Sequence, residues 1–147
     1  MLVSDILRSK PAGIHQIIET AALSTAAGLM LSSRIGALVV EGALGQLTGL
    51  ISEREITSAL ARWGSEAHRH RVVEVMVRDT PIARPNDRVM DLIAIMTHHR
   101  ARHVPILDEH QALVGILSIG DLLKSRLDEK IQENLILQDI SRLHQAA

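Results

Sequence analysis

An internal repeat of 66 residues constrains this chain more than any other feature of its sequence. Sliding the chain against itself by 66 residues places Met30 on Met96, Arg34 on Arg100 and Gly49 on Gly115. No gap is needed from about residue 14 to residue 58, and apolar positions fall together throughout. Such self-similarity at a fixed period indicates one supersecondary unit that is written twice.

Each copy predicts the element order β-α-β-β-α. A short apolar segment is followed by apolar residues spaced three to four apart, which indicates a helix. Two apolar runs joined by a short turn then predict a β-hairpin, and a second helix begins near Ser52 and near Ser118. The predicted strands span residues 14–18, 37–40 and 46–51 in the first copy and 81–83, 103–107 and 112–117 in the second.

The fold class is therefore α/β (α+β), with both copies packed into one pseudo-twofold module, because one unit of this size buries little surface by itself. We assign residues 1–62 to the first copy, 63–71 to a linker, 72–126 to the second copy and 127–147 to a C-terminal helix. Apolar residues on this helix exceed what a small domain needs to cover. We interpret it as a homodimer contact, and the alternative is that it packs back on its own module.

Composition excludes several classes of function. There is no Cys, which excludes disulfides and thiolate chemistry and fits a reducing cytoplasm. The formal net charge of −1 gives no bulk attraction to nucleic acid or to an anionic membrane. With one Trp and no Phe or Tyr, the aromatic platform that binds single-stranded nucleic acid is missing. We expect no signal peptide and no membrane span, and therefore a cytoplasmic protein.

Two stretches carry a family resemblance. Gly-Leu-Ile-Ser-Glu-Arg-Glu at 49–55 corresponds to Gly-Ile-Leu-Ser-Ile-Gly-Asp at 115–121, and Arg-His-Val-Pro-Ile-Leu-Asp stands at 102–108. Over roughly residues 2 to 126 the chain resembles the CBS domain pair, named after cystathionine β-synthase. It is similar to the free-standing bacterial CBS-pair proteins that have no enzyme attached.

The resemblance implies a regulatory module that senses energy or cofactor state. CBS pairs bind AMP, ADP, ATP, NAD or S-adenosylmethionine in the cleft between their two copies. They often dimerise into a flat disc, so the implied partners are a small-molecule nucleotide, a second copy of the chain and a regulated protein that the sequence does not identify.

The second copy holds the better of two expected ligand sites. A helix that starts at Ser118 offers free backbone N–H groups to a phosphate, and the resemblance assigns the ribose hydroxyls to Asp121. Arg102 and His103 are natural phosphate ligands. The alternative is that Ser118 only caps the helix, that Asp121 is only a favourable first-turn acid, and that Arg102 forms a surface salt bridge. Three further residues, expected to hold the base or to let a ligand approach, are Thr80, Ile82 and Pro105.

The first copy departs from this pattern. Gly36 and Ala37 stand where Arg102 and His103 stand in the second copy, which removes two phosphate ligands. The acid at the start of the first copy's helix is Glu55 instead of Asp. The cofactor-binding residues assigned to this half of the molecule are Gln16, Gly36, Ala37, Ser52, Arg54 and Glu55. We therefore expect two unequal clefts.

Metal binding and catalysis have little support in the sequence. The pairs His68/His70 and His98/His99 lack the spacing and partners of a metal site, so we expect no metal. Neither a Gly-x-Ser-x-Gly motif nor a P-loop is present. The leading hypothesis is a non-enzymatic nucleotide-binding regulator. The alternatives are a structural interaction protein of the same fold that binds no ligand and, third, a small hydrolase that uses the histidines.

Overall fold

The computed structural model describes residues 1–11, 13 and 16–146. Its helices are α1 (Val3–Ser9), α2 (Leu23–Ser33), α3 (Glu53–Trp63), α4 (Val89–His99) and α5 (Ile119–Ala146), with short 3-10 helices at Gly64–Arg69 and Val72–Glu74. Its strands are β1 (Gln16–Ile18), β2 (Ala37–Glu41), β3 (Leu47–Ser52), β4 (His103–Leu107) and β5 (Leu113–Ser118). The mixed α/β fold predicted from the repeat is confirmed. Ile14, at the start of the first predicted strand, lies outside the described residues.

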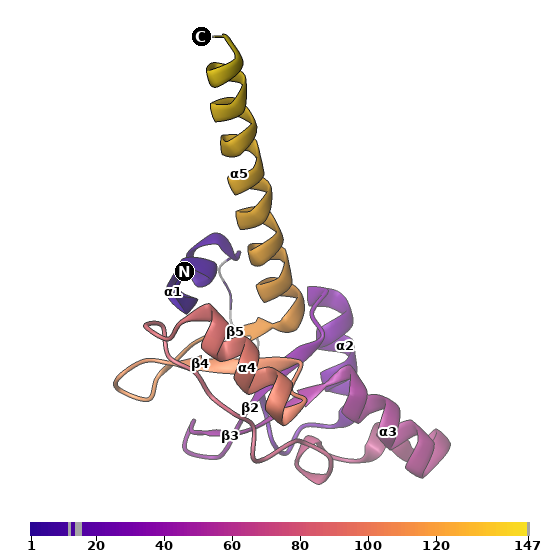
Figure 1. The fold of residues 1–147 in the computed structure, drawn as a ribbon. Coiled ribbons are helices and arrows are strands. Elements are labelled where there is room, and N and C mark those ends of the chain that lie inside the picture. The colour runs from indigo at the N-terminus through magenta and orange to yellow at the C-terminus, as the bar shows by residue number, and fades with distance from the viewer. Residues whose placement is uncertain (12, 14–15, 147) are drawn as a thin grey trace.

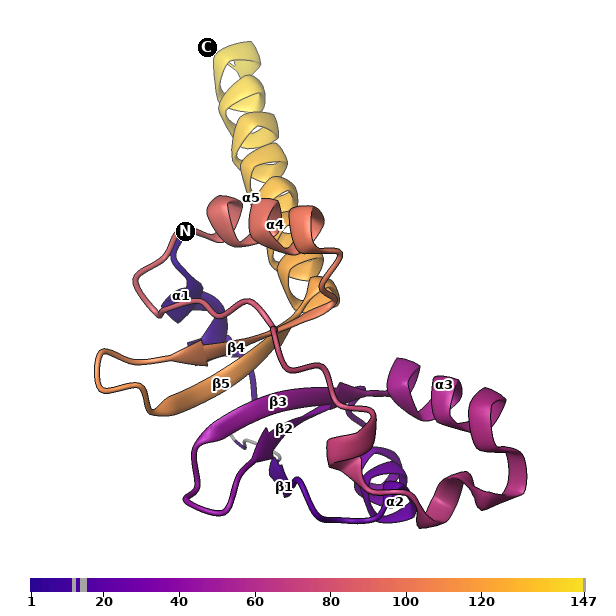
Figure 2. The same cartoon turned by 90° about the horizontal axis from the view of Figure 1, so that it is seen from below.

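Two small sheets form the middle of the molecule. In one, β1 pairs in parallel with β2, and β2 pairs antiparallel with β3; in the other, β4 pairs antiparallel with β5. Helices α2 and α3 lie on the side of the first sheet, and α4 and α5 lie on the side of the second (Figure 2). The hairpins predicted after the first helix of each copy are therefore present.

The predicted strand at 81–83 is wrong in extent. Only Ala83 forms a bridge, with Ile106, and this matches the pairing of Ile17 with Val40 one repeat earlier. Its N–H donates to the carbonyl of Pro105, and its carbonyl accepts from the N–H of Leu107. Pro81 and Pro85 flank this bridge, and because a proline has no N–H to donate, the pairing does not extend.

Each copy has its own aliphatic core, but the segments that begin the two copies are exchanged. Val3 and Ile6 of α1 are buried in the core of the second copy. Val72 and Met76, at the start of the second copy, are buried in the core of the first. This exchange ties the copies together beyond the linker. The division of the chain at residues 63–71 stays a prediction.

Helix α5 projects from the module (Figure 1). Its first turns contact the rest of the chain, and Leu122 there is fully buried. Beyond that point its apolar side chains are exposed, with Leu127 at 62% and Leu143 at 71%. The alternative that this helix packs back on its own module is therefore wrong. Within residues 1–11, 13 and 16–146, no helix is long and apolar enough to cross a membrane.

Candidate functional site

Two cavities lie where the copies meet. Cavity 1, of about 300 Å³, is lined by Leu50, Ser52, Arg54, Glu55, Val77, Asp79, Thr80, Pro81, His99, Arg100, Ala101, Arg102 and His103. Cavity 2, of about 760 Å³, is lined by Leu7, Arg8, Lys10, Pro11, Gly13, Ser33, Arg34, Ile35, Gly36, Ala37, His103, Val114, Gly115, Ile116, Ser118 and Asp121. Both volumes fall in the range of small-molecule sites, roughly 300 to 1,000 Å³.

Each cavity combines the helix start of one copy with the strand start of the other. In cavity 1, Ser52 and Glu55 at the start of α3 face Arg102, which directly precedes β4. In cavity 2, Ser118 and Asp121 at the start of α5 face Gly36 and Ala37, which belong to the first copy. The expectation that Arg102 shares a site with Ser118 and Asp121 is therefore corrected.

The crossing follows from how the copies are packed. The strand starts of both copies approach one another at the seam, where a Cβ placed on Gly36 would lie 3.5 Å from Nε2 of His103. His103 lines both cavities, as the wall that they share. A side chain at the start of one strand thus points across the seam toward the helix start of the other copy.

Three residues that we assigned to the site lie outside both cavities. Pro105 is buried inside the two-stranded sheet, and Ile82 is exposed to solvent. Gln16 begins β1 with an exposed side chain. Pro105 lies opposite Ile116 of β5, and its carbonyl accepts from the N–H of Ala83 on the other side of β4, so it is not at the open edge that its missing N–H predicts. Thr80 lines cavity 1.

Both helix starts carry a capping box. The N–H of Ser118 donates to Oδ2 of Asp121 at 2.8 Å, and the N–H of Asp121 donates to Oγ of Ser118 at 3.1 Å. In the first copy the N–H of Ser52 donates to Oε2 of Glu55 at 2.7 Å, and the hydroxyl of Ser52 also donates to this carboxylate. These bonds fix the two acids at the cavity walls, so the capping role and a ligand role use the same groups.

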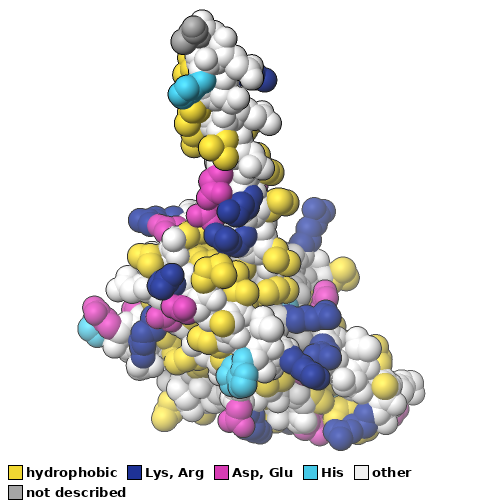
Figure 3. All heavy atoms as spheres, viewed as in Figure 1, with side chains coloured by type: hydrophobic (Ala, Val, Ile, Leu, Met, Phe, Trp, Pro, Cys, Tyr) yellow, Lys and Arg dark blue, Asp and Glu magenta, His cyan; other side chains and the backbone are white. Residues whose placement is uncertain are grey.

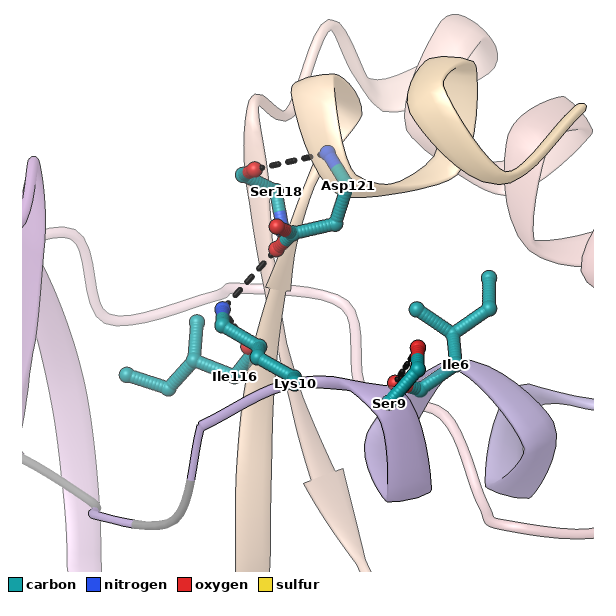
Figure 4. Close-up of polar contacts among 6 residues, drawn as sticks. All are labelled: Ile6, Ser9, Lys10, Ile116, Ser118 and Asp121. Atoms are coloured by element: carbon teal, nitrogen blue, oxygen red, sulfur yellow. Dashed lines mark hydrogen bonds and ion pairs between the residues drawn. The ribbon is translucent and has the colours of Figure 1, made fainter. Parts of the chain in front are cut away.

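Asp121 has a second partner that the sequence did not reveal. The ammonium of Lys10 lies 2.8 Å from Oδ2 of Asp121 and also donates to the carbonyl of Ile116 at 2.8 Å (Figure 4). Burial acts to raise the pKa of Asp121, but the hydrogen bonds from Lys10 and Ser118 outweigh it and hold that pKa below its ordinary value. The carboxylate is therefore ionised and already paired.

Cavity 1 is rich in arginine. Arg54, Arg100 and Arg102 line it, and within the described part of the chain none of the three forms an ion pair. Burial, together with the charge of Lys10, lowers the pKa of His103. His103 is therefore neutral near pH 7, and the positive charge of cavity 1 comes from guanidinium groups, which bind phosphate in bidentate fashion.

Arg34 and Arg100 line the cavities but were not among the residues assigned from the sequence. Both end a helix in the left-handed backbone region, with φ of 53° and 52°, where glycine is favoured. Arg34 lines cavity 2 and Arg100 lines cavity 1. Their match at 66 residues was visible in the sequence, and an arginine kept twice at a position that favours glycine was the overlooked indication. Lys10 gave no such indication, because its partner is 111 residues away.

Among the residues that the structure describes, no group of three His, Cys, Asp or Glu side chains is arranged to hold a metal ion. His98 and His99 contact each other edge to face, with ring centroids 5.1 Å apart. His99 lines cavity 1 beside the arginines. His99 thus contributes to a cavity wall.

Comparison with known proteins gives consistent matches along the chain. The family model described as CBS domain matches residues 3–62 and again 72–128. A CBS domain-containing protein of Bacillus subtilis, YhcV, is 32% identical over 109 residues, which are 74% of this chain and 75% of that protein.

Solved structures agree with this match. The CBS-domain containing protein ATU1752 from Agrobacterium tumefaciens has a TM-score of 0.80 and 34% identity, covering 85% of this chain and 92% of its own. The CBS domain pair of protein MJ0100, solved in complex with 5′-methylthioadenosine and S-adenosyl-L-methionine, has a TM-score of 0.73 and 25% identity. The match covers 88% of this chain and 97% of that one.

Proposed function

This chain belongs to the CBS domain family, and from that membership we propose that it is a non-enzymatic regulatory module that binds an adenosine-containing ligand between its two copies. The observation that carries the proposal is the pair of cavities at the seam. In each cavity a serine that caps a helix and a nearby acid line the same walls as cationic side chains. A ligand that contacts both copies has a differential affinity for their relative arrangements, and regulation requires this difference.

The charge of cavity 1 supports a phosphorylated ligand such as AMP, ADP, ATP or NAD. Three arginines without ion-pair partners among the described residues supply donors for phosphate oxygens, and Glu55 stands where a ribose hydroxyl acceptor is needed. The MJ0100 pair, which shares this fold at 25% identity, was solved with adenosine compounds that carry no phosphate. S-adenosylmethionine therefore belongs among the ligands to be tested.

Isothermal titration calorimetry with AMP, ADP, ATP, NAD and S-adenosylmethionine tests the proposal. We expect micromolar binding of at least one ligand, weakened about tenfold or more by Arg102→Gln through loss of a charged hydrogen bond. The matched control is Arg69→Gln, since Arg69 is exposed and lines neither cavity. Absence of binding by all five ligands at millimolar concentration would refute the proposal and favour an interaction protein of CBS fold. Turnover of a bound nucleotide would refute the non-enzymatic part.

We further propose that α5 forms a homodimer contact. Its 28 residues make a helix about 42 Å long at 1.5 Å per residue, and hydrophobic side chains run along it (Figure 3). Neighbours four residues apart, such as Leu127 and Ile131, lie next to each other on the helix surface. The exposed apolar side chains of α5 are Leu123, Leu127, Ile131, Leu135, Ile136, Leu137, Ile140 and Leu143. A second copy of the same helix offers a surface of matching chemistry and length.

Sedimentation velocity measures this contact. We expect a dimer for the unmodified chain and a monomer for Ile131→Glu, because the charge would be buried in the helix pair. Gln132→Glu adds the same charge on a neighbouring face and should remain a dimer. A monomeric unmodified chain at tens of micromolar would contradict the contact. We place this regulatory role in the cytoplasm, with which the absence of cysteine is compatible.

A further inference from the structure

Lys10 is paired with Asp121, whose carboxylate would accept the ribose hydroxyls of an adenosine ligand in cavity 2. Its ammonium donates to Asp121 and to the carbonyl of Ile116, both at 2.8 Å (Figure 4). The side chains of Lys10 and Asp121 are 37% and 27% exposed, so the pair lies at the cavity wall and is accessible to a ligand. The two lysine contacts both fall on the second copy.

The position of Lys10 is fixed by the exchange of α1. Val3 and Ile6 of that helix are buried in the second core, and the N–H of Val3 donates to the carbonyl of Asp87 at 2.9 Å. The N–H of Lys10 then caps α1 by donating to the carbonyl of Ile6 at 3.1 Å. The lysine backbone is therefore anchored, while its four-carbon side chain is free to change partner.

Charge in cavity 2 is unbalanced toward cations. Arg8, Lys10 and Arg34 line it, and the acidic residue among its described lining residues is Asp121. Arg8 is paired with Asp5 outside that wall, but Arg34 forms no ion pair within the described part of the chain. When ribose hydroxyls bind Asp121, the ammonium of Lys10 loses its carboxylate. A ligand phosphate restores an anionic partner, whereas adenosine and 5′-methylthioadenosine, which carry no anionic group, do not.

We propose that Lys10 is the specificity-determining residue of cavity 2 and makes it select nucleoside 5′-phosphates over adenosine compounds that carry no anionic group. The selection rests on the proposed adenosine-ligand function. In the empty cavity Lys10 neutralises Asp121; in the occupied cavity it binds the phosphate. A ligand without an anionic group displaces the ammonium from Asp121 and leaves it without an anionic partner, which lowers that ligand's affinity.

Methyl NMR titration distinguishes the two cavities, since Val114 and Ile116 line cavity 2 and Leu50 and Val77 line cavity 1. The probes are AMP, adenosine and 5′-methylthioadenosine. At the cavity 2 methyls we expect AMP to bind about tenfold or more tightly than adenosine, as one charged hydrogen bond provides.

Variants of Lys10 test whether this side chain sets the preference for AMP. Lys10→Met should weaken AMP binding and leave adenosine binding equal or stronger, so that the preference falls to about twofold or less. Lys10→Arg keeps a cation and should keep the preference, and Lys124→Met, in an exposed part of α5, should change nothing.

Equal weakening of AMP and adenosine by Lys10→Met would overturn the inference, because a merely structural lysine would act in this way. The same holds if the unmodified chain binds both ligands equally. If none of the probes shifts methyls in either cavity, the proposed function itself fails. These two failures are therefore distinguishable in one data set.

Discussion

Replacing Asp121 by Asn in the ligand-free chain removes interactions whose sum can be worked out from the structure. The Lys10 ammonium loses its carboxylate partner, and for a partly exposed pair this costs about 0.2–1 kcal/mol. The Ser118 N–H exchanges a charged acceptor for a neutral one, which costs about 0.5–1 kcal/mol. Loss of a first-turn acid adds about 0.3–1 kcal/mol. The expected total is a loss of about 1–3 kcal/mol in the free energy of unfolding.

The matched control is Asp91→Asn. Asp91 is also the third residue of its helix, α4, where no side-chain capping bond is formed. It should therefore lose only the first-turn term of about 0.3–1 kcal/mol. Urea unfolding at pH 7, low salt and one protein concentration measures both variants. The two variants should differ by about 1 kcal/mol.

A double-mutant cycle isolates the lysine. Lys10→Met and Asp121→Asn share one interaction, so their effects should be non-additive by about 0.2–1 kcal/mol. Additive effects, or an Asp121→Asn variant no less stable than Asp91→Asn, would refute the reasoning, because Lys10 and Asp121 would then not be coupled in solution.

Three further predictions concern the fold and its pH dependence. Gly49→Ala should destabilise by about 1–3 kcal/mol, because a Cβ there would lie 2.6 Å from a backbone carbonyl oxygen. Gly28→Ala, which meets nothing within 4 Å, should be neutral or stabilising by thermal melting. Ile6→Ala should lower the free energy of unfolding by about 2–5 kcal/mol, because its side chain is buried in the second core. The control Leu31→Ala, at a side chain that is 82% exposed, should lower it by about 0.5 kcal/mol or less. Equal effects of the two substitutions would argue against the exchange of α1. The folded pKa of Asp121 lies below its ordinary value of 3.8, so its stabilisation is present above pH 3.8 and is lost as pH falls through the lower folded pKa. The acid limb of a stability-versus-pH curve should accordingly be shallower for Asp121→Asn, and an unchanged limb would contradict this assignment.

The repeat predicted the local structure well because each prediction rested on neighbouring residues. The irregularity between Val40 and Glu41 recurs between Ile106 and Leu107, and both hairpins form where the turns were expected. The strand at 81–83 was overpredicted, since the effect of flanking prolines on pairing was not weighed. A C-terminal helix was also predicted, but the choice between a packed and a projecting helix depends on contacts that its own residues do not encode.

The site was predicted in its residue types and mispredicted in its grouping. The serine and acid at each helix start were found because a capping motif is local in sequence. Arg102 was assigned to the helix start of its own copy, whereas the structure places it beside Ser52 and Glu55 of the other. The assumption that failed was that a side chain serves the copy to which it belongs.

Local patterns in the sequence were enough to give the period of 66 and the element types, because apolar spacing and turn chemistry act over a few residues. The tertiary structure alone decided which residues face each other across the seam. It exchanged α1 onto the second core and thereby brought Lys10 to Asp121, 111 residues away. Packing two similar units about a pseudo-twofold axis opposes the ends of different copies, and no local pattern specifies that contact.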